Sequence, residues 1–461
     1  MNPDIFRAYD IRGIADTDLI DPVVENIGQA FASMIVDQGQ DMPRVGVGRD
    51  ARDSSERIYK ALERGLKKAG AHVVDLAVVP TPLTYFATFQ NDYDGAIQIT
   101  GSHNPGEYNG FKMMLGKETL HGDRIQALYE RIEADDLITT DQDRGSSAKA
   151  DLRKNYIEWI RDNIKMGDRK LRIAADSGNG VAGIVAPELL HDACGVKVHE
   201  LYTEPDGSFP NHHPDPTVEE NLADLIDAVR HHDCDFGVAY DGDGDRIGVV
   251  DETGDIIWGD ELLILFARQV LADNPGATII GEVKCSQTLF DDIEDRGGQA
   301  IMARVGHSLI KAKLRETNAE LAGEMSGHIF FNDRFFGFDD ALYATCRLAE
   351  IVSRTNQPLS ALLADVPKTY ATPEIRQPCD EQLKFEVPGL VADRFSGDYE
   401  VNTIDGVRIK FNNGWGLVRA SNTQPVVVMR AEGDTPESRD RYMKLLEDAV
   451  EEAEQQLQSS T

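Results

Sequence analysis

The chain has 461 residues, of which 41% are hydrophobic, so it is long enough for three or four domains with cores of their own. Its net charge of -33 argues against unspecific nucleic-acid binding and against docking on anionic membranes, because both need a basic surface. No apolar run approaches the roughly 20 residues that span a bilayer. We therefore expect neither a nucleic-acid nor a membrane partner.

The cysteines indicate a reducing compartment. Cys194, Cys234, Cys285, Cys346 and Cys379 are scattered and form no CxxC pair, which argues against a disulfide framework and a zinc site. The N-terminal segment also lacks the apolar core of a signal peptide. We expect a cytoplasmic protein.

Three stretches share one pattern, a short apolar run followed by a polar or glycine-rich turn. They lie at residues 45–50, 171–178 and 278–284. Helices are predicted after the first two, over residues 55–68 and 181–191. This alternation of strand and helix predicts three successive α/β units with mixed or parallel sheets.

Two stretches are candidate domain boundaries. Residues 134–147 are acidic and nearly free of large apolar side chains. Residues 368–380 follow Pro367 and contain Pro373 and Pro378. The remaining C-terminal piece is predicted to be a smaller α+β unit. It ends in an acidic helix over residues 436–457, whose charge suits a solvated face.

A serine occupies a tight turn after the apolar segment 96–99. The turn reads Thr100-Gly101-Ser102-His103-Asn104-Pro105. Its glycine, asparagine and proline favour a sharp turn at the end of a strand, where a hydroxyl is exposed for chemistry. On these six residues alone, an ordinary turn with a capping serine remains the simpler interpretation.

The segment 178–183 matches the dinucleotide-binding pattern GxGxxG. It lies between a predicted strand and a predicted helix, and Glu200 follows about 20 residues later, as the fingerprint requires. Taken alone, the match makes an NAD-dependent dehydrogenase a serious alternative. The other explanation is close packing of helix and strand, which requires small residues.

A run of alternating acids predicts a metal site. Asp241, Asp243 and Asp245 lie between two strand-like apolar segments, 236–239 and 247–250. Carboxylates at every second position can converge on one side of an extended segment, where they repel one another unless a cation neutralises them. Ligands that are all oxygen suit Mg²⁺ or Ca²⁺ better than zinc.

An EF-hand was considered for the same loop and rejected. The three aspartates match loop positions one, three and five, and Glu252 falls at position twelve. Position six, however, requires glycine for its sharp turn and is Arg246 here, and the flanks are strand-like. Three protein ligands remain, a number that suits Mg²⁺ shared with a phosphate.

Two later loops carry groups suited to a sugar phosphate. In Gly323-Glu324-Met325-Ser326-Gly327-His328, the glutamate and serine can hydrogen-bond sugar hydroxyls and His328 can move a proton near neutral pH. In residues 419–425, a guanidinium, two hydroxyls, an amide and backbone N–H groups form a phosphate cradle. Each loop alone also fits an ordinary connection between strands.

Taken together and in this order, the serine turn, the acidic run and the two later loops resemble the α-D-phosphohexomutases, most closely the bacterial phosphomannomutase/phosphoglucomutase branch. Further segments that carry the resemblance are residues 6–13 (FRAYDIRG), 80–82, 111–113, 283–286, 306–308 and 414–416. Two positions depart from the pattern: Gln424, where a second threonine is expected, and Val305, where a threonine is common.

The resemblance implies an α/β fold of four domains around a central cleft. Three are related α/β domains with mixed sheets, and the smaller C-terminal one is α+β. On this chain they correspond to residues 1–147 with the serine loop, 148–250 with the metal loop, 251–367 with the sugar-recognition loop, and 368–461 with the phosphate loop. In the family the segment at Gly178 binds no nucleotide, which sets the dehydrogenase alternative aside.

The resemblance also implies an enzymatic activity. This is reversible phosphoryl transfer between O1 and O6 of mannose and glucose phosphates, with hexose 1,6-bisphosphate as intermediate and activator. Ser102 would carry the phosphoryl group, and one Mg²⁺ would be held by Asp241, Asp243, Asp245 and the phosphorylated Ser102. Sugar phosphates would be the only partners, and we expect a monomer.

Roles for other residues follow from the same resemblance. Lys112 and His328 are the proton-transfer candidates, supported by Arg12 and His103. Neighbouring bases could lower the pKa of Lys112. The substrate-binding residues would be Arg7, Tyr9, Arg246, Lys284, His307, Glu324, Ser326, Arg419, Ser421, Asn422 and Thr423.

Several of these residues carry a more specific expectation. Glu324 and Ser326 would contact O3 and O4 of the sugar, and Met325, where the glucosamine branch has glutamine, favours mannose and glucose. We expect a basic cleft inside an acidic shell, because many bases lie in the motifs. These bases are Arg7, Arg12, Arg49, Lys112, Arg246, Lys284, Arg304 and Arg419.

Two alternatives use the same residues. A phosphatase would pass the phosphoryl group from Ser102 to water and would release free phosphate from glucose 1-phosphate. A degenerate, binding-only mutase would hold sugar phosphates without turnover. The intact serine, the aspartate triad and the Glu324 loop argue against the second alternative.

Overall fold

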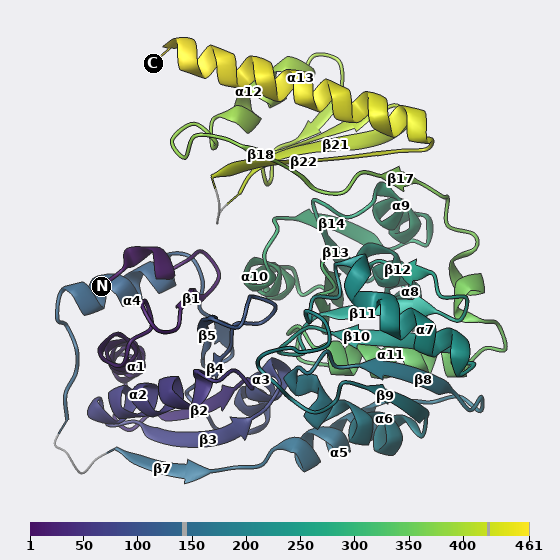
Figure 1. Ribbon diagram of the computed structural model, residues 1–461. Helices are drawn as coiled ribbons and strands as arrows, with labels where there is room; N and C mark the ends of the chain where they lie inside the picture. Colours follow the sequence, from purple (N-terminus) through teal and green to yellow (C-terminus); the bar gives the residue numbers. More distant parts are fainter. Residues whose placement is uncertain (141–144, 422–424, 461) are drawn as a thin grey trace.

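The computed structural model describes residues 1–140, 145–421 and 425–460. These residues form four units in chain order, three of the α/β type and a smaller α+β unit (Figure 1). The fourth unit, green to yellow, stands over the other three, with α13 on its outer side. The predicted fold class is confirmed.

The first unit has a mixed sheet with the order β1-β5-β4-β2-β3-β7, and β6 pairs with β5. Its strands are β1 (Ile11–Ile14), β2 (Arg44–Arg49), β3 (His72–Val78), β4 (Gly95–Ile99), β5 (Tyr108–Leu115), β6 (Glu118–Thr119) and β7 (Ser146–Lys149). Its helices are η1 (Pro3–Ile5), α1 (Asp21–Val36), α2 (Ser55–Lys68), α3 (Thr81–Gln90) and α4 (Asp123–Glu133).

The second unit has the sheet order β12-β11-β10-β8-β9. Its strands are β8 (Arg172–Asp176), β9 (Lys197–Leu201), β10 (Phe236–Tyr240), β11 (Ile247–Asp251) and β12 (Ile256–Ile257). Its helices are α5 (Arg153–Asn163), η2 (Val181–Ile184), α6 (Ala186–Cys194), η3 (Glu219–Leu222) and α7 (Ala223–His231).

The third unit has the sheet order β14-β13-β15-β16. Its strands are β13 (Thr278–Glu282), β14 (Gln299–Ala303), β15 (Leu321–Gly323) and β16 (Ile329–Phe331). Its helices are α8 (Gly259–Asp273), α9 (Gln287–Asp295), α10 (His307–Thr317), α11 (Ala341–Ser353) and η4 (Leu359–Leu363).

The fourth unit is an antiparallel sheet with the order β17-β22-β21-β20-β19, and β18 also pairs with β22. Its strands are β17 (Tyr370–Ala371), β18 (Ile375–Pro378), β19 (Glu400–Asn402), β20 (Val407–Phe411), β21 (Gly414–Ala420) and β22 (Val426–Gly433). Helices α12 (Val387–Phe395) and α13 (Pro436–Ser460) pack on this sheet.

The first three sheets repeat one arrangement, which fixes where their loops lie. Three parallel strands stand side by side, as β3-β2-β4, β9-β8-β10 and β14-β13-β15. An antiparallel strand then pairs with the last of the three, as β5, β11 and β16. The serine, metal and sugar loops are the three equivalent connections, β4–β5, β10–β11 and β15–β16.

The predicted elements agree with the structure except at their ends. The strand patterns correspond to β2, β8 and β13, and the helix over residues 55–68 is α2 as predicted. The helix expected over residues 181–191 starts as the 3-10 turn η2, and α6 begins only at Ala186, because Pro187 favours a first helical turn there. α6 then continues to Cys194 and ends at Gly195 in a left-handed conformation. The first sheet extends to Lys149, two residues beyond the expected boundary.

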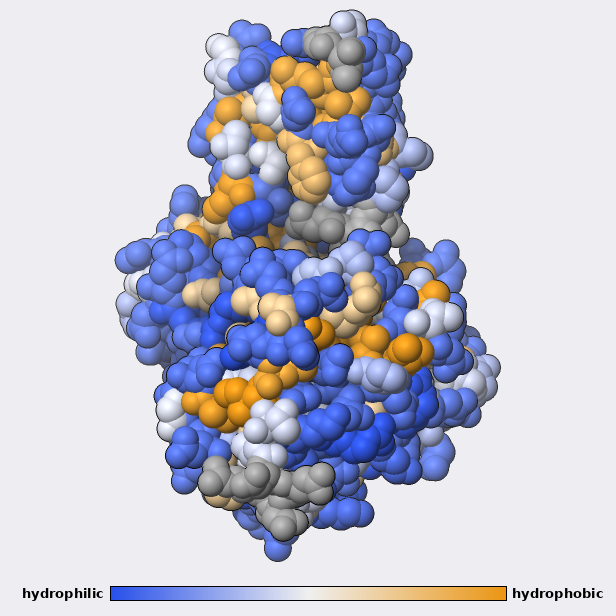
Figure 2. Space-filling model, turned by 90° about the vertical axis from the view of Figure 1, so that its left-hand side faces the viewer, coloured by the Kyte–Doolittle hydropathy of each residue, from blue (hydrophilic) through white to orange (hydrophobic). Residues whose placement is uncertain are grey.

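Hydrophilic side chains cover most of one face of the molecule. The face shown in Figure 2 is mostly hydrophilic, with separate hydrophobic areas, and a constriction sets the upper unit apart from the rest. Among the residues that the structure describes, no helix is both long enough and apolar enough to cross a membrane.

Close packing of α1 against α2 holds the first unit together. Ile58, Leu62 and Leu66, spaced four residues apart on one face of α2, are fully buried. The two helices approach closely because a glycine lies on each: a Cβ at Gly28 would meet the backbone of Leu62, and one at Gly65 would meet the backbone of α1. Any larger residue at either glycine must push the helices apart.

Gly65→Ala should therefore destabilise the protein. Its methyl group would overlap the carbonyl oxygen of Glu25, and overpacking of this kind costs about 1–3 kcal/mol of unfolding free energy. Urea and thermal denaturation followed by circular dichroism would measure the loss. Gly389→Ala is the matched control. This helical glycine has open space around it, so the change should raise the free energy of unfolding by up to about 1 kcal/mol. Equal stabilities for the two variants would contradict the packing argument.

Candidate active site

Ser102 lies at the end of β4 in a strained conformation. Its φ of 50° is in the left-handed region, which a residue with a side chain adopts only where its surroundings hold it. Its N–H donates to Thr100 Oγ1 at 2.8 Å. Its hydroxyl donates to Asp241 Oδ2 at 2.8 Å and lies 3.1 Å from His103 Nδ1.

The metal loop folds back on its first aspartate. Asp241 Oδ1 accepts hydrogen bonds from the backbone N–H groups of Gly244, Asp245 and Arg246 at 3.0–3.2 Å. This folding brings carboxylate oxygens of Asp241, Asp243 and Asp245 within 4.8 Å of one another, and all three side chains are fully buried.

The donor set fits a hard divalent cation. Asp243 Oδ1 and Asp245 Oδ1 are buried and have no hydrogen-bond partner among the described residues. Buried charged oxygens without a partner are costly, and a cation with oxygen ligands satisfies them. The residues present therefore suit a metal ion at this position.

Lys112, from β5 of the first unit, balances part of this charge. Its Nζ lies 2.7 Å from Asp243 Oδ2 and 2.5 Å from Asp245 Oδ2. Burial acts to lower the pKa of Lys112, but Asp243 and Asp245 outweigh burial and raise it above its ordinary value. The expectation of a lowered pKa was therefore wrong, because the nearest groups to the ammonium are carboxylates rather than the other bases.

Asp241 and Asp243 lie on the same loop, but their pKa values are shifted in opposite directions. Burial and the neighbouring Asp243 and Asp245 raise the pKa of Asp241 well above its usual range. Burial acts in the same direction on Asp243, but Lys112 and hydrogen bonds, including one from the Thr81 hydroxyl at 2.5 Å, hold its pKa below the ordinary value. The pKa values of these two neighbouring aspartates therefore differ, because Lys112 lies against Asp243.

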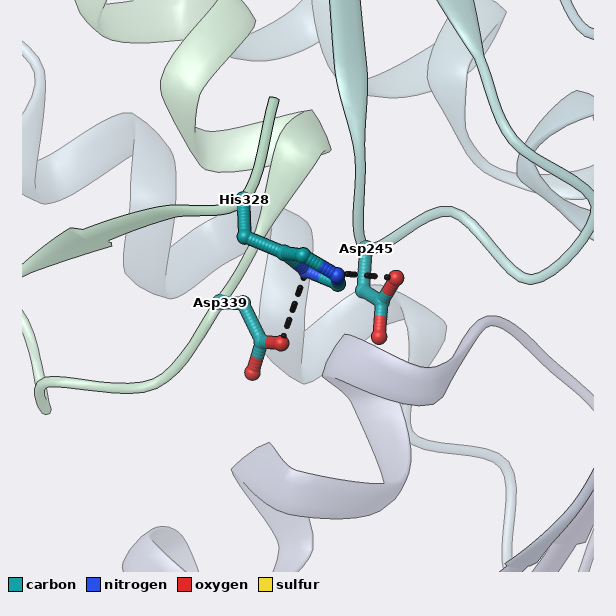
Figure 3. A group of neighbouring side chains, drawn as sticks. All are labelled: Asp245, His328 and Asp339. Carbon is teal, nitrogen blue, oxygen red and sulfur yellow. Dashed lines mark ion pairs between the residues drawn. The ribbon is translucent and has the colours of Figure 1, made fainter. Parts of the chain in front are cut away.

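His328 points between two carboxylates (Figure 3). Its Nδ1 lies 3.0 Å from Asp339 Oδ2 and 3.6 Å from Asp245 Oδ1. Its Nε2 accepts a hydrogen bond from Arg246 Nε at 2.9 Å, so the network assigns the ring proton to Nδ1. Asp339 was not predicted from the sequence, and it fixes the orientation of the imidazole.

Asp245, His328 and Asp339 form a second group with the spacing of metal ligands, but cationic partners already lie against both of its carboxylates. Lys311 Nζ already lies 2.8 Å from Asp339 Oδ1, and Lys112 binds Asp245, so ammonium groups supply the positive charge there.

The nearby His307 is neutral at physiological pH, because burial and Lys311 lower its pKa to about 4. His103 is likewise held neutral: burial, followed by Arg246 and Arg12, lowers its pKa well below the usual range.

A cavity of about 1280 Å³ lies between the units, directly above this centre. All four units contribute to its lining. The predicted residues that line it are Arg7, Tyr9, Arg12, His103, Arg246, Lys284, His307, Glu324, Ser326, His328, Arg419 and Ser421. Ser102, Lys112 and the three aspartates of the metal loop are buried and are not part of the lining. The expectation that the turn exposes the Ser102 hydroxyl was therefore wrong, because the hydroxyl is directed at Asp241 of the metal loop.

Two of the predicted bases do not line the cavity. Arg49 is bound to Asp75 at 2.6 Å within the first unit, and Arg304 is not among the lining residues. Asn422 and Thr423 lie outside the residues that the structure describes. The bases of the lining are Arg7, Arg12, Arg246, Lys284, Lys368, Arg376, Arg419 and Arg430, and nine acidic residues line the cavity with them. Among the described residues the lining therefore mixes both signs, and the expected basic cleft is not present.

A further set of contacts involves the third unit. Glu324 Oε1 accepts from the Gly306 N–H at 2.7 Å, which ties the sugar loop to the start of α10. The Tyr9 hydroxyl donates to the Val305 carbonyl at 3.0 Å, and the Val305 N–H donates to Asp405 Oδ2, also at 3.0 Å. Asp405 was not predicted; it lies 3.2 Å from Arg419 Nη2 in the fourth unit.

The GxGxxG segment supports the metal loop. A Cβ at Gly180 would lie 2.9 Å from the Gly242 carbonyl oxygen, and the Val181 N–H donates to that oxygen at 3.1 Å. The chain continues as the four-residue 3-10 turn η2 rather than as an α-helix aimed at a phosphate. Close packing, the second explanation considered for this pattern, accounts for the glycines.

Three copies of one α/β arrangement and a smaller fourth unit, all opening on one cavity, place the chain among the four-domain α/β enzymes. The chain belongs to the phosphoglucomutase/phosphomannomutase family. Residues 3–139, 154–254 and 258–370 match its alpha/beta/alpha domains I, II and III, and residues 374–449 match its C-terminal domain.

Full-length relatives agree with this assignment. A phosphomannomutase/phosphoglucomutase of Pseudomonas aeruginosa is 47% identical over 438 residues, which are 95% of this chain and 93% of the relative. A phosphoglucomutase of Neisseria gonorrhoeae is 44% identical over 451 residues, 97% of each chain. The crystal structure of a phosphoglucomutase/phosphomannomutase family protein from Burkholderia thailandensis superposes with a TM-score of 0.92 at 45% identity and covers 98% of both chains.

Replacing an aspartate of the triad should weaken metal binding directly. We expect Asp243→Asn to bind Mn²⁺, used as a paramagnetic probe, about 100-fold more weakly, since even groups behind the ligands contribute roughly 10–100-fold. Electron paramagnetic resonance titration measures free Mn²⁺ without any turnover. Asp227→Asn, on the exposed face of α7, is the control and should bind like wild type. Unchanged binding by Asp243→Asn would move the metal site elsewhere.

Proposed function

We propose that the protein is a phosphohexomutase that reversibly transfers a phosphoryl group between O1 and O6 of mannose and glucose phosphates. One observation carries the proposal: the Ser102 hydroxyl donates to Asp241 of a buried aspartate triad, next to a cavity with several arginines to which all four units contribute. The names of the relatives, phosphomannomutase/phosphoglucomutase and phosphoglucomutase, support it.

Ser102 acts as the phosphoryl carrier in this proposal. A sugar hydroxyl, O1 or O6, bonds to phosphorus as the bond between phosphorus and Ser102 Oγ breaks, and the serine oxygen leaves. The product is hexose 1,6-bisphosphate, which turns around and returns its other phosphoryl group to Ser102. Asp241, Asp243, Asp245 and the phosphorylated Ser102 would hold Mg²⁺, which when bound offsets negative charge on the transferring group.

The proton of the attacking hydroxyl needs an acceptor. His328 is our candidate for this role, and its Nδ1 lies 3.0 Å from Asp339 Oδ2. Its Nε2 accepts from Arg246 Nε in this structure, so Arg246 has to release that nitrogen before it can take a proton. Lys112 is suited to a different task. Its ammonium stays protonated between Asp243 and Asp245, so it can stabilise the serine oxygen and the transferring group as a cation and a donor.

Individual guanidinium groups, rather than a cavity of one sign, would receive an anionic substrate. Arg7, Arg12, Arg246, Lys284 and Arg419 all line the cavity, but acidic residues line it with them. Arg419 and Ser421, with Asn422 and Thr423, would bind the phosphate that does not react. Glu324 and Ser326 would bind O3 and O4, which both orientations of the sugar present.

The site is complete within one chain, since all four units contribute to the same cavity, so we propose a monomer. We also propose a cytoplasmic location, which the five free cysteines support. A serine phosphatase remains the second candidate, because it would use the same serine and metal. A coupled assay for glucose 6-phosphate formed from glucose 1-phosphate, with free phosphate measured in parallel, separates the two.

Ser102→Ala should abolish mutase turnover, because no carrier hydroxyl remains. In wild type treated with glucose 1,6-bisphosphate, intact-mass and peptide mass spectrometry should find one added phosphoryl group on Ser102. Ser177→Ala is a matched control, since this buried hydroxyl in the second unit has no hydrogen-bond partner among the described residues. Stable phosphate found only on another residue would refute the carrier assignment.

Arg419→Ala should weaken both sugars alike. Loss of a charge-assisted partner for a dianion is worth about 1.5–3 kcal/mol, or roughly a 10- to 150-fold fall in kcat/KM. Steady-state assays with mannose 1-phosphate and glucose 1-phosphate measure it. The variant should also depend more on added glucose 1,6-bisphosphate, because a looser clamp lets the intermediate escape. A loss for one sugar only would show that Arg419 reads the sugar rather than the phosphate.

A further inference from the structure

The strained serine turn needs an external support that the catalytic groups do not supply. Ser102 has a φ of 50°, a conformation that costs free energy for a residue with a side chain. The contacts of its side chain, to Asp241 and His103, hold the hydroxyl but not the backbone. The carbonyl groups of the turn must therefore be held by something beneath it.

Arg52 provides that support through four hydrogen bonds to backbone carbonyls. Its Nη2 donates to Ser102 O at 2.8 Å and to Asn104 O at 2.6 Å. Its Nη1 donates to Pro105 O at 2.5 Å and to Tyr108 O at 3.1 Å. The side chain is almost completely buried, with 1% of its surface exposed, so water does not compete for these bonds.

The guanidinium is itself fixed on both sides. Asp50 Oδ2 accepts from Arg52 Nε at 3.1 Å and from the Gly101 N–H at 3.0 Å, so one carboxylate joins the arginine to the turn. On the other side the guanidinium lies over the ring of Phe209, from the second unit, at 5.3 Å. A Cβ at Gly101 would collide with the guanidinium, so the turn and the arginine fit only in this arrangement.

From this geometry we infer that Arg52 is a positioning residue for phosphoryl transfer, holding the Ser102 turn so that its oxygen faces the aspartate triad. The inference rests on the proposed function of Ser102 as carrier. Arg52 does not line the substrate cavity, so it acts only through the turn. A lysine at this position keeps the charge, but its three donors on a single nitrogen cannot span four carbonyls arranged as a fork.

The test is a single-turnover measurement on Arg52→Lys. Wild-type and variant enzymes are phosphorylated with glucose 1,6-bisphosphate whose phosphoryl groups carry ¹⁸O, desalted, and mixed with excess unlabelled glucose 6-phosphate. Loss of the labelled phosphoryl group from Ser102 is followed by quenched-flow mass spectrometry, because the group that returns to Ser102 comes from the unlabelled sugar. We expect the first-order rate constant to fall roughly 10- to 100-fold, the size of loss that a 1 Å misplacement of a reacting group produces. The concentration of sugar phosphate at half-saturation should stay within about twofold, since the cavity is untouched.

Arg57→Lys is the matched control. Arg57 lies in the same unit and also donates to backbone carbonyls, those of Ala15 at 2.7 Å and Leu19 at 3.0 Å, but away from the serine turn. Its rate constant should equal that of wild type. Partial unfolding lowers the amplitude of the reaction and not its first-order rate constant, so a purely structural role would leave the constant unchanged and overturn the inference.

Asp50→Asn is the variant to measure if Arg52→Lys does not fold. It keeps the arginine but removes the carboxylate charge that anchors both Arg52 and Gly101, and it should slow transfer several-fold with saturation unchanged. A wild-type rate constant in Asp50→Asn would then overturn the inference. A wild-type enzyme that carries no phosphate on Ser102 would refute the proposed function first, an outcome distinct from a phosphorylated variant that transfers normally.

Discussion

Three carboxylates buried on one short loop repel one another, and much of the molecule is arranged to balance them. Two unit charges under 5 Å apart repel by about 3 kcal/mol at an effective dielectric constant of 20. Part of the compensation comes from other units: Lys112 and the Thr81 hydroxyl reach the loop from the first, and His328 from the third. The loop is therefore stable only where the first three units meet, which couples assembly of the units to formation of the site.

The repeated sheet explains why sequence motifs far apart converge. In each of the first three units the loop of interest joins the last parallel strand to the antiparallel strand beside it, so equivalent positions carry Ser102, the aspartate triad and Glu324. The fourth unit uses an antiparallel pair, β21–β22, and presents Arg419 at the end of β21. One structural position, used repeatedly with different side chains, yields a complete reaction centre.

The sequence predicts this centre well where a residue lies in a distinctive local pattern. Ser102, the three aspartates and Glu324 lie in glycine-bearing turns between apolar strands, and the structure brings them together. Arg52, Asp339 and Asp405 could not be found in this way, because their local sequences are ordinary. Arg52 and Asp405 bind backbone groups 50 and 100 residues away, and Asp339 reaches His328 only through the pairing of the chain around β16. The direction of the pKa shift of Lys112 also depends on contact distances that no spacing reveals. Pro187, in contrast, marked the start of α6 in the sequence itself.

The supports that the sequence does not reveal act by preorganisation. Asp405 holds the Arg419 guanidinium at 3.2 Å, and the same carboxylate accepts from the Val305 N–H, whose carbonyl accepts from Tyr9. One residue of the third unit, Val305, thus links Arg419 of the fourth unit to the first unit. A side chain already fixed in this way loses little rotamer entropy when a phosphate arrives, a saving of about 0.5–1.5 kcal/mol for an arginine. The carboxylate that fixes it also repels the phosphate. Binding therefore depends on Arg419 Nε, which has no partner among the described residues, and on the other bases of the cavity.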